Sequence, residues 1–194
     1  MSKSDPASQK KERRKAIRWV ITIFLVTIVI SGTISLISDE IMASSNMIVA
    51  FLILLFIVLI GIVFDIIGVA VTSADEKPFH SMAARKVPGG QEAIRLLRNA
   101  ERVSSICNDV IGDICGVVSG SASATIAAQI LQNIEFSWPN LVSLVMSALV
   151  AGLTVGGKAI GKTFAINSCT RIISAVGKVI YTFRNFFRVF QKKK

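Results

Sequence analysis

The sequence has few residues of the kinds that carry enzyme chemistry. It holds one histidine and three cysteines in 194 residues. The histidine, His80, lies in a polar stretch without a cysteine or serine partner at the spacing of a known catalytic motif. The run Gly156-Gly157-Lys158 lacks the strand and the further glycine spacing of a phosphate-binding loop. The cysteines (Cys107, Cys115 and Cys169) show no metal-ligand spacing and are interpreted as small packing residues. We therefore expect that the chain is not an enzyme.

Apolar residues dominate the composition. Hydrophobic residues make up 52% of the chain and the mean hydropathy is +0.62, which is too apolar for an ordinary soluble domain. Residues 16–37, 47–71 and 139–157 are each long enough to cross a hydrocarbon core. Residues 106–131 are richer in glycine, serine and alanine, as is typical of a helix buried among other helices. The sequence therefore predicts an all-α integral membrane bundle with four transmembrane spans.

Lysine and arginine are absent from two of the loops between these spans. Loops 38–46 and 132–138 hold Asp39, Glu40 and Glu135 instead. The basic residues precede the first span, separate the second span from the third, and follow the fourth. This positive-inside pattern predicts a multi-pass protein of the cell membrane with both termini in the cytoplasm. The basic residues behind the net charge of +10 then set the orientation of the protein in the membrane and contact anionic lipids, so no nucleic-acid partner is expected.

The segments outside the core spans have distinct compositions. Residues 1–15 are predicted to form a disordered basic tail, and residues 16–37 an additional span that is retained as an anchor. The connector 74–104 is divided by Pro88-Gly89-Gly90 into two short helical pieces, of which the second is a juxtamembrane helix. Residues 168–190 show an apolar stripe interrupted by basic residues, which predicts an amphipathic interfacial helix.

One predicted span carries small residues at every fourth position. These residues are Gly112, Gly116, Gly120, Ala124 and Ala128. Such a small-residue ridge lets another helix approach closely, within one chain or between two chains. We expect it to take part in helix association.

Ionisable residues inside the predicted spans need an explanation. They are Asp65, Asp109, Asp113 and Lys158, with Lys162 one helical turn after Lys158. A charge at the centre of a transmembrane helix costs about 2.5 to 3.5 kcal/mol, so such residues pair, line a wet cavity or snorkel to an interface. We expect the three aspartates and Lys158 to meet in one cavity. An ion pair that merely locks the bundle is the alternative.

Three short stretches resemble a known set of motifs. Residues 72–77 read Thr-Ser-Ala-Asp-Glu-Lys, residues 106–108 read Ile-Cys-Asn, and residues 157–163 read Gly-Lys-Ala-Ile-Gly-Lys-Thr. In this order they resemble the transmembrane domain of the cyclin-M/CorB family of magnesium transport proteins, whose motifs are Phe-Ser-x-Ser-Glu-Thr, Ile-Gly-Asn and Gly-Glu-Ile-Ile-Pro-Lys-Thr. The resemblance covers residues 47–190, and the family's CBS-pair domain has no counterpart in this sequence.

The resemblance implies a homodimer that transports magnesium. It places the metal ligands at Ser73 and Asn108, with Glu76 shaping the site, and oxygen donors of this kind suit a hard cation. Taken singly, Ser73 reads as a helix cap and Asn108 as a buried hydrogen-bonding residue. No resident cofactor is expected besides the transported ion.

Lys158 departs from the family pattern, because it stands where the family has a glutamate. At about 4 Å and an effective dielectric near 20, one unit charge is worth about 4 kcal/mol, so a permanent cation close to the ion path strongly opposes a divalent ion. Two functions therefore stay open. The first is divalent cation transport. The second is a non-transporting scaffold or regulatory subunit for an unidentified membrane or cytoplasmic partner, in which Lys158 occupies the ion cavity.

Overall fold

The computed structural model describes residues 6–43, 45–133 and 138–191, and all of the ordered elements among them are helical. The all-α prediction is therefore confirmed. The elements in chain order are α1 (Pro6–Ala43), α2 (Met47–Ser73), α3 (Lys77–Ala84), α4 (Gly90–Arg98), α5 (Ala100–Ser105), the π-helical segment η1 (Ile106–Gly112), α6 (Asp113–Asn133), α7 (Pro139–Asn167) and α8 (Cys169–Gln191).

Four stretches of helix in the described part of the chain are long and apolar enough to cross a membrane. They are Ile17–Met42, Met47–Ser73, Ala100–Gln132 and Asn140–Asn167. The third begins six residues before the predicted span, because α5, η1 and α6 follow one another without a break. The fourth continues beyond Gly157 and so includes Lys158. The prediction of four candidate spans is confirmed.

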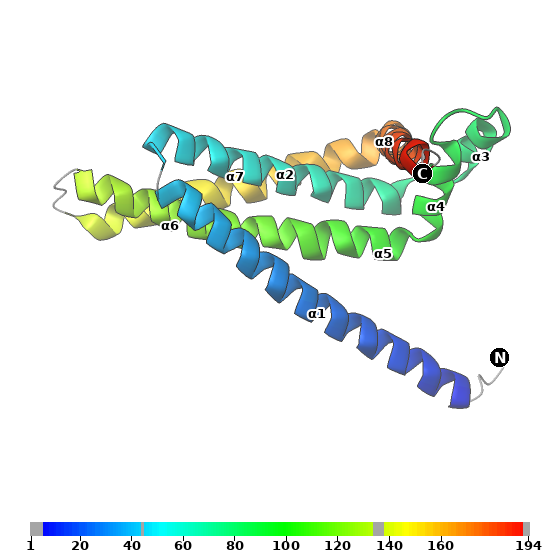
Figure 1. The fold of residues 1–194 in the computed structure, drawn as a ribbon, viewed down its shortest axis with the longest axis horizontal. Coiled ribbons are helices and arrows are strands. Elements are labelled where there is room, and N and C mark those ends of the chain that lie inside the picture. Colours follow the sequence, from blue (N-terminus) through cyan, green and yellow to red (C-terminus); the bar gives the residue numbers. More distant parts are fainter. Residues whose placement is uncertain (1–5, 44, 134–137, 192–194) are drawn as a thin grey trace.

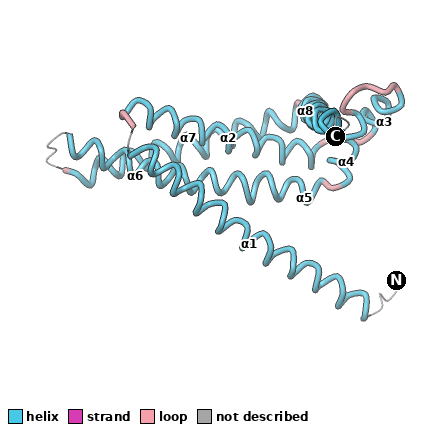
Figure 2. The backbone as a smooth tube through the Cα atoms, viewed as in Figure 1, coloured by secondary structure: helices cyan, strands magenta, loops and turns pink. Residues whose placement is uncertain are grey.

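The helices α2, α6 and α7 form a bundle in which α6 runs antiparallel to α2 and α7, with α5 and η1 preceding α6 along α2 (Figure 1). The N-terminal part of α1, the short helices α3 and α4, and α8 lie at one end, and the C-terminal ends of α1 and α6 lie at the other (Figures 1 and 2). The basic segments thus gather at the same end of the bundle. Orientation in a membrane stays a prediction.

Helix α1 packs against α6 through its C-terminal half and diverges from the bundle toward its N-terminus (Figure 1). The Ser121 hydroxyl donates to both carboxylate oxygens of Asp39, at 2.9 and 3.1 Å, and Gln129 Nε2 donates to the carbonyl oxygen of Met42 at 2.9 Å. Further along, the Arg102 guanidinium lies 5.7 Å from the centre of the Trp19 ring. Residues 1–5 of the predicted disordered tail lie outside the described residues, and α1 begins at Pro6.

Three apolar clusters hold these elements together. The first joins α1, α2, α6 and α7 and comprises Met42, Ala50, Leu54, Val58, Ala122, Ile126 and Val150. The second joins α2 to the connector, α7 and α8 and comprises Ala70, Val71, Phe79, Ala93, Leu97, Ala165 and Ile173. The third comprises Val110, Ile114 and Val118, against which Ile23 and Ile57 pack. The packed face of α6 is therefore the one that carries Ile114, Val118, Ala122 and Ile126.

The small-residue ridge lies largely on the open side of α6. Gly112 is buried, whereas Gly116 and Gly120 have no atoms within 4 Å of the place where a side chain would begin, and Ala124 and Ala128 are exposed. Within this chain the ridge is therefore not a helix-packing face, apart from Gly112. The surface that it leaves open is available to a second chain.

Helix α8 crosses the end of the bundle and is seen nearly end-on in Figure 1. It packs on α4 and α2. Gly89 has a φ of 88°, a left-handed conformation that favours glycine, and a Cβ there would lie 2.5 Å from the Lys178 amide nitrogen and 2.6 Å from the Gly177 carbonyl carbon. The two glycines thus permit a backbone-to-backbone contact between the α3–α4 turn and α8.

Candidate functional site

The polar interior of the bundle contains an ion pair between α7 and α2. Lys158 Nζ lies 3.5 Å from Asp65 Oδ1, and the two side chains are 25% and 17% exposed. Because both residues lie within candidate spans, each neutralises a charge that is costly to hold in a membrane. The structure thus shows an Asp–Lys ion pair, which the sequence left open as the alternative, with Asp65 as the carboxylate.

The π-helical segment η1 lies directly beside this pair. A Cβ on Gly112 would lie 3.3 Å from Lys158 Nζ and 3.8 Å from Asp65 Oδ1. The missing side chain therefore lets the ion pair rest against the last turn of η1. Single π-turns inside α-helices occur frequently at functional sites, because they alter the backbone hydrogen-bond ladder.

Asn108, near the start of η1, has a half-satisfied carboxamide. Its Nδ2 donates to Ser104 Oγ at 3.3 Å, whereas its Oδ1 is buried and has no hydrogen-bond partner in the described part of the chain. A buried acceptor left unpaired costs about 1 to 3 kcal/mol. This oxygen faces Gly68 of α2, where a Cβ would overlap the carboxamide and lie 2.7 Å from its Cγ. Gly68 therefore makes the space that Asn108 fills.

The other two aspartates do not join Lys158. The Ser105 hydroxyl donates to Asp109 Oδ2 at 2.8 Å, and both Asp109 and Asp113 are exposed in the single chain. Within the described residues the carboxylate within 4 Å of Lys158 is that of Asp65. The expected meeting of three aspartates is thus reduced to one pair, because Asp109 and Asp113 lie on a side of their helix that this chain leaves uncovered.

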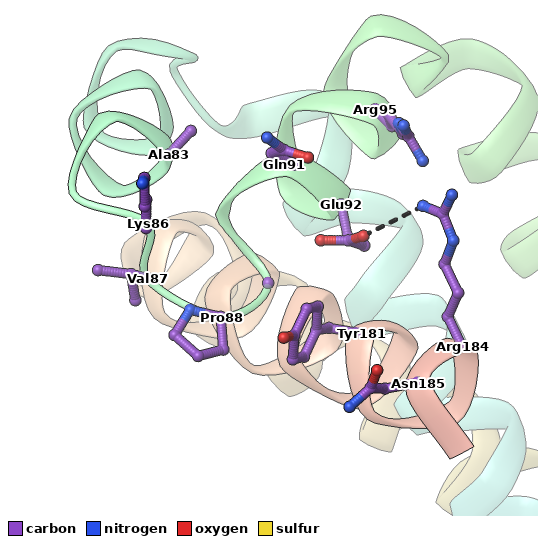
Figure 3. Close-up of a pocket in the computed structure, with 11 residues that line it drawn as sticks. Ala83, Lys86, Val87, Pro88, Gln91, Glu92, Arg95, Tyr181, Arg184 and Asn185 are labelled. Carbon is purple, nitrogen blue, oxygen red and sulfur yellow. Dashed lines mark hydrogen bonds and ion pairs between the residues drawn. The ribbon is translucent and has the colours of Figure 1, made fainter. Parts of the chain in front are cut away.

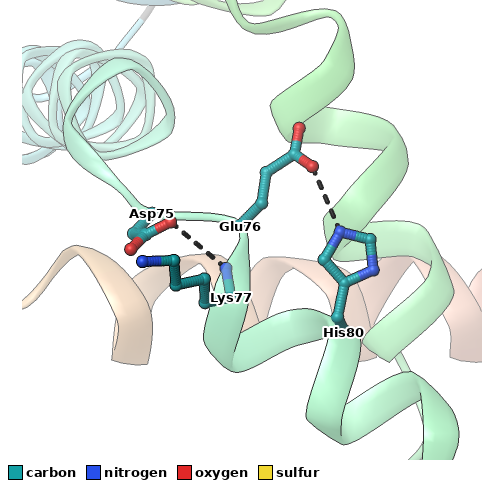
Figure 4. Close-up of polar contacts among 4 residues, drawn as sticks. All are labelled: Asp75, Glu76, Lys77 and His80. Carbon is teal, nitrogen blue, oxygen red and sulfur yellow. Dashed lines mark hydrogen bonds and ion pairs between the residues drawn. The ribbon is translucent and has the colours of Figure 1, made fainter.

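Ser73 and Glu76 lie at the junction between α2 and α3. Ser73 is the last residue of α2 and is exposed. Glu76 precedes α3, and its Oε2 lies 3.2 Å from His80 Nε2 (Figure 4). Asp75 Oδ1 accepts a hydrogen bond from the Lys77 amide at 3.2 Å, so Asp75 and not Ser73 satisfies a backbone donor at the start of α3 (Figure 4).

These positions separate the predicted metal ligands in this conformation. Ser73 follows Gly68 by five residues, which places it about 140° around α2 from the side that faces Asn108. Glu76 is engaged with His80. Among the described residues no group of three or more His, Cys, Asp or Glu side chains is placed to hold a metal ion. The ligand set Ser73, Glu76 and Asn108 stays a prediction.

Sequence reasoning missed two features of this region, namely the π-helical segment and the role of Gly68. The signal for Gly68 was present, since it is one of only two glycines in the bulky apolar run of α2. Its partner Asn108 lies 40 positions away, and helical periodicity does not relate residues that are so far apart in the sequence.

The four candidate spans define the class of the chain, by length and composition, as a multi-pass membrane protein. Comparisons with protein-family models, with curated proteins and with solved structures gave no match. The resemblance to the cyclin-M/CorB family therefore stays a prediction that depends on the three motifs in this sequence.

Proposed function

We propose that this multi-pass membrane protein transports a divalent cation, with magnesium as the first ion to test, and that Asn108 is a ligand. The observation that carries the proposal is the buried Asn108 Oδ1, which has no hydrogen-bond partner among the described residues. Magnesium and calcium take oxygen ligands, including the amide oxygens of asparagine. A cation at this oxygen recovers the free energy that an unpaired buried acceptor costs.

The α2–α3 junction supplies the remaining ligands in this proposal. Ser73 and Glu76 lie at the same end of α2 as Gly68, where α2 packs on α5 and η1. Movement of residues 73–77 relative to η1 would bring their oxygens toward Asn108. Such a movement is the kind of change that alternating exposure of a site requires, since the ion must meet different surroundings on the two sides.

Lys158 acts in this proposal as a tethered cation that competes with the ion. It contacts Asp65 beside Gly112, which follows Asn108 by four residues on η1. Its positive charge lowers the affinity of a nearby site for a divalent ion. Release of Asp65 from Lys158 would add a carboxylate to the ion's surroundings.

A non-transporting scaffold or regulatory subunit is the second candidate function. The Lys158–Asp65 ion pair favours it, because the protein's own ammonium group then fills the polar interior permanently. In that case the unpaired Asn108 oxygen binds no ion and only lowers the stability of the local packing.

Assembly and orientation belong to the same proposal. The open ridge at Gly116, Gly120, Ala124 and Ala128 fits a homodimer, in which α6 of two chains approach closely. Both termini lie in the cytoplasm in this account, with the basic end of the bundle toward anionic lipids.

Thermal unfolding in detergent tests the metal site. Magnesium at about 100 times its Kd is expected to stabilise the protein by about 2.7 kcal/mol. The stabilisation should vanish in Asn108→Ala and persist in Asn99→Ala, whose side chain is exposed and donates to the Arg95 carbonyl oxygen at 2.9 Å. Equal stabilisation of all three proteins would show that magnesium binds elsewhere.

A further inference from the structure

A polar pocket opens between the α3–α4 turn and α8, away from the candidate metal site (Figure 3). Its volume is about 380 Å³. Its charged lining residues are Lys86, Glu92, Arg95 and Arg184, and Gln91, Tyr181 and Asn185 add neutral polar groups.

The pocket is built on the tight contact that docks α8. Gly89 is one of the lining residues, and Gly177 approaches the Gly89 carbonyl oxygen so closely that a Cβ on Gly177 would lie 2.6 Å from it. The fully buried side chains of Phe79 and Ile173 belong to the cluster that holds α3 and α8 against α2. The walls of the pocket are therefore fixed by packing and not only by the polar side chains.

The charges in the pocket are unbalanced. Arg184 Nη1 lies 3.4 Å from Glu92 Oε1, which is 9% exposed, so this carboxylate neutralises one cation. Arg95 points toward Arg184 in Figure 3, and Lys86 lines the opposite wall. The lining residues thus carry three cations and one carboxylate, and the excess positive charge favours an anion.

Lys86 occupies a backbone position that favours glycine. Its φ is 55°, and its amide donates to the Ala83 carbonyl oxygen at 3.0 Å as α3 ends. A residue in this left-handed conformation at a helix C-terminus is usually glycine, because a side chain there is strained. A lysine at this place is consistent with a use for its ammonium group in the pocket.

We propose that this pocket binds the phosphate of an anionic lipid headgroup. Arginine presents a fork of donors that matches phosphate oxygens, and lysine adds a point charge. Helix α8 supports a lipid as the source, because Val179, Ile180 and Phe183 are exposed on the helix that also contributes Tyr181 and Arg184. An amphipathic helix of this kind lies in the headgroup region of a bilayer, where basic pockets hold lipid headgroups.

Native mass spectrometry of the detergent-solubilised full chain, titrated with phosphatidylglycerol, tests this site. Lys86→Gly removes the cation and relieves the strained backbone, so it should fold as stably as the wild type and bind the lipid about tenfold more weakly. The matched control is Arg85→Gln, which removes a neighbouring exposed charge outside the pocket and should leave the affinity unchanged. Arg95→Gln is a second variant within the pocket and should also weaken binding.

Three outcomes would overturn the proposal. Equal losses in Lys86→Gly and Arg85→Gln would show that surface charge alone attracts the lipid. Retention of phosphatidylcholine as strong as that of phosphatidylglycerol would show that negative charge is not recognised. Inorganic phosphate that binds as tightly as the lipid, with the same loss in Lys86→Gly, would make free phosphate and not a headgroup the ligand.

Discussion

Gly68 on α2 and Asn108 on η1 approach so closely that a methyl group on Gly68 would overlap the Asn108 carboxamide. This contact places a polar side chain of η1 against α2, three residues along α2 from Asp65. It also leaves the Asn108 oxygen buried and unpaired within the described residues. The relationship between these two residues is therefore the structural basis of the proposed ion site.

Gly68→Ala tests this contact. The new methyl group has to displace Asn108, and overpacking of this kind typically costs about 1 to 3 kcal/mol of the free energy of unfolding. Gly152→Ala is the matched control on α7, since among the described residues nothing lies within 4 Å of its Cβ position. Thermal unfolding in detergent should show a loss for Gly68→Ala alone. Equal unfolding temperatures for the two variants would mean that Asn108 does not occupy the space beside Gly68.

Lys158→Met tests the ion pair. Removal of one partner from a fully buried pair costs about 3 to 5 kcal/mol. The 25% and 17% exposure of Lys158 and Asp65 should reduce the loss to about 1 to 3 kcal/mol, because solvent screens partly exposed charges. Chemical unfolding in mixed micelles measures this loss of unfolding free energy. The control is Lys162→Met, because Lys162 is exposed.

The double variant Asp65→Asn/Lys158→Met completes this test. It removes both charges together, so it should be more stable than Lys158→Met alone. If the losses of unfolding free energy in Asp65→Asn and in Lys158→Met add up to the loss in the double variant, the two residues do not interact in the folded protein.

Gly89→Ala tests the docking of α8. The substitution places a side chain in a left-handed conformation, which costs about 1 to 2 kcal/mol, and drives its Cβ into the backbone of Gly177 and Lys178. Hydrogen exchange in α8 should rise, whereas Gln91→Ala, an exposed neighbour on α4, should leave it unchanged. Unaltered exchange in Gly89→Ala would show that α8 is held without the glycine contact.

The sequence was sufficient to predict the helices because their signals are local. Long apolar runs identified the four candidate spans, and Pro88-Gly89-Gly90 identified the turn between α3 and α4. The beginning of the third span was missed, because the polar residues of α5 look like a connector until η1 and α6 extend them into one continuous helix.

The candidate site was harder to predict because it depends on which faces of the helices meet. The position of each residue along its span predicted a similar depth in the membrane for Asp65, Asp109, Asp113 and Lys158. The rotation of each helix about its axis, however, decides which of these side chains touch. The small residues of α6 were expected at a helix contact within one chain or between two chains, whereas the face buried within this chain carries Val118, Ala122 and Ile126. Packing between segments that are distant in the sequence decides which face of each helix is turned toward its neighbours. A single sequence does not show this packing.

Magnesium flux into proteoliposomes tests whether this chain transports the ion. Flux above that of protein-free liposomes is expected for the wild type and for Asn99→Ala, and loss of that flux is expected in Asn108→Ala. The same assay should include Lys158→Glu, which removes the tethered cation and should raise flux. Flux that is absent from the wild type, and gained only in Lys158→Glu, would contradict transport by this chain and support the scaffold with a permanently filled interior.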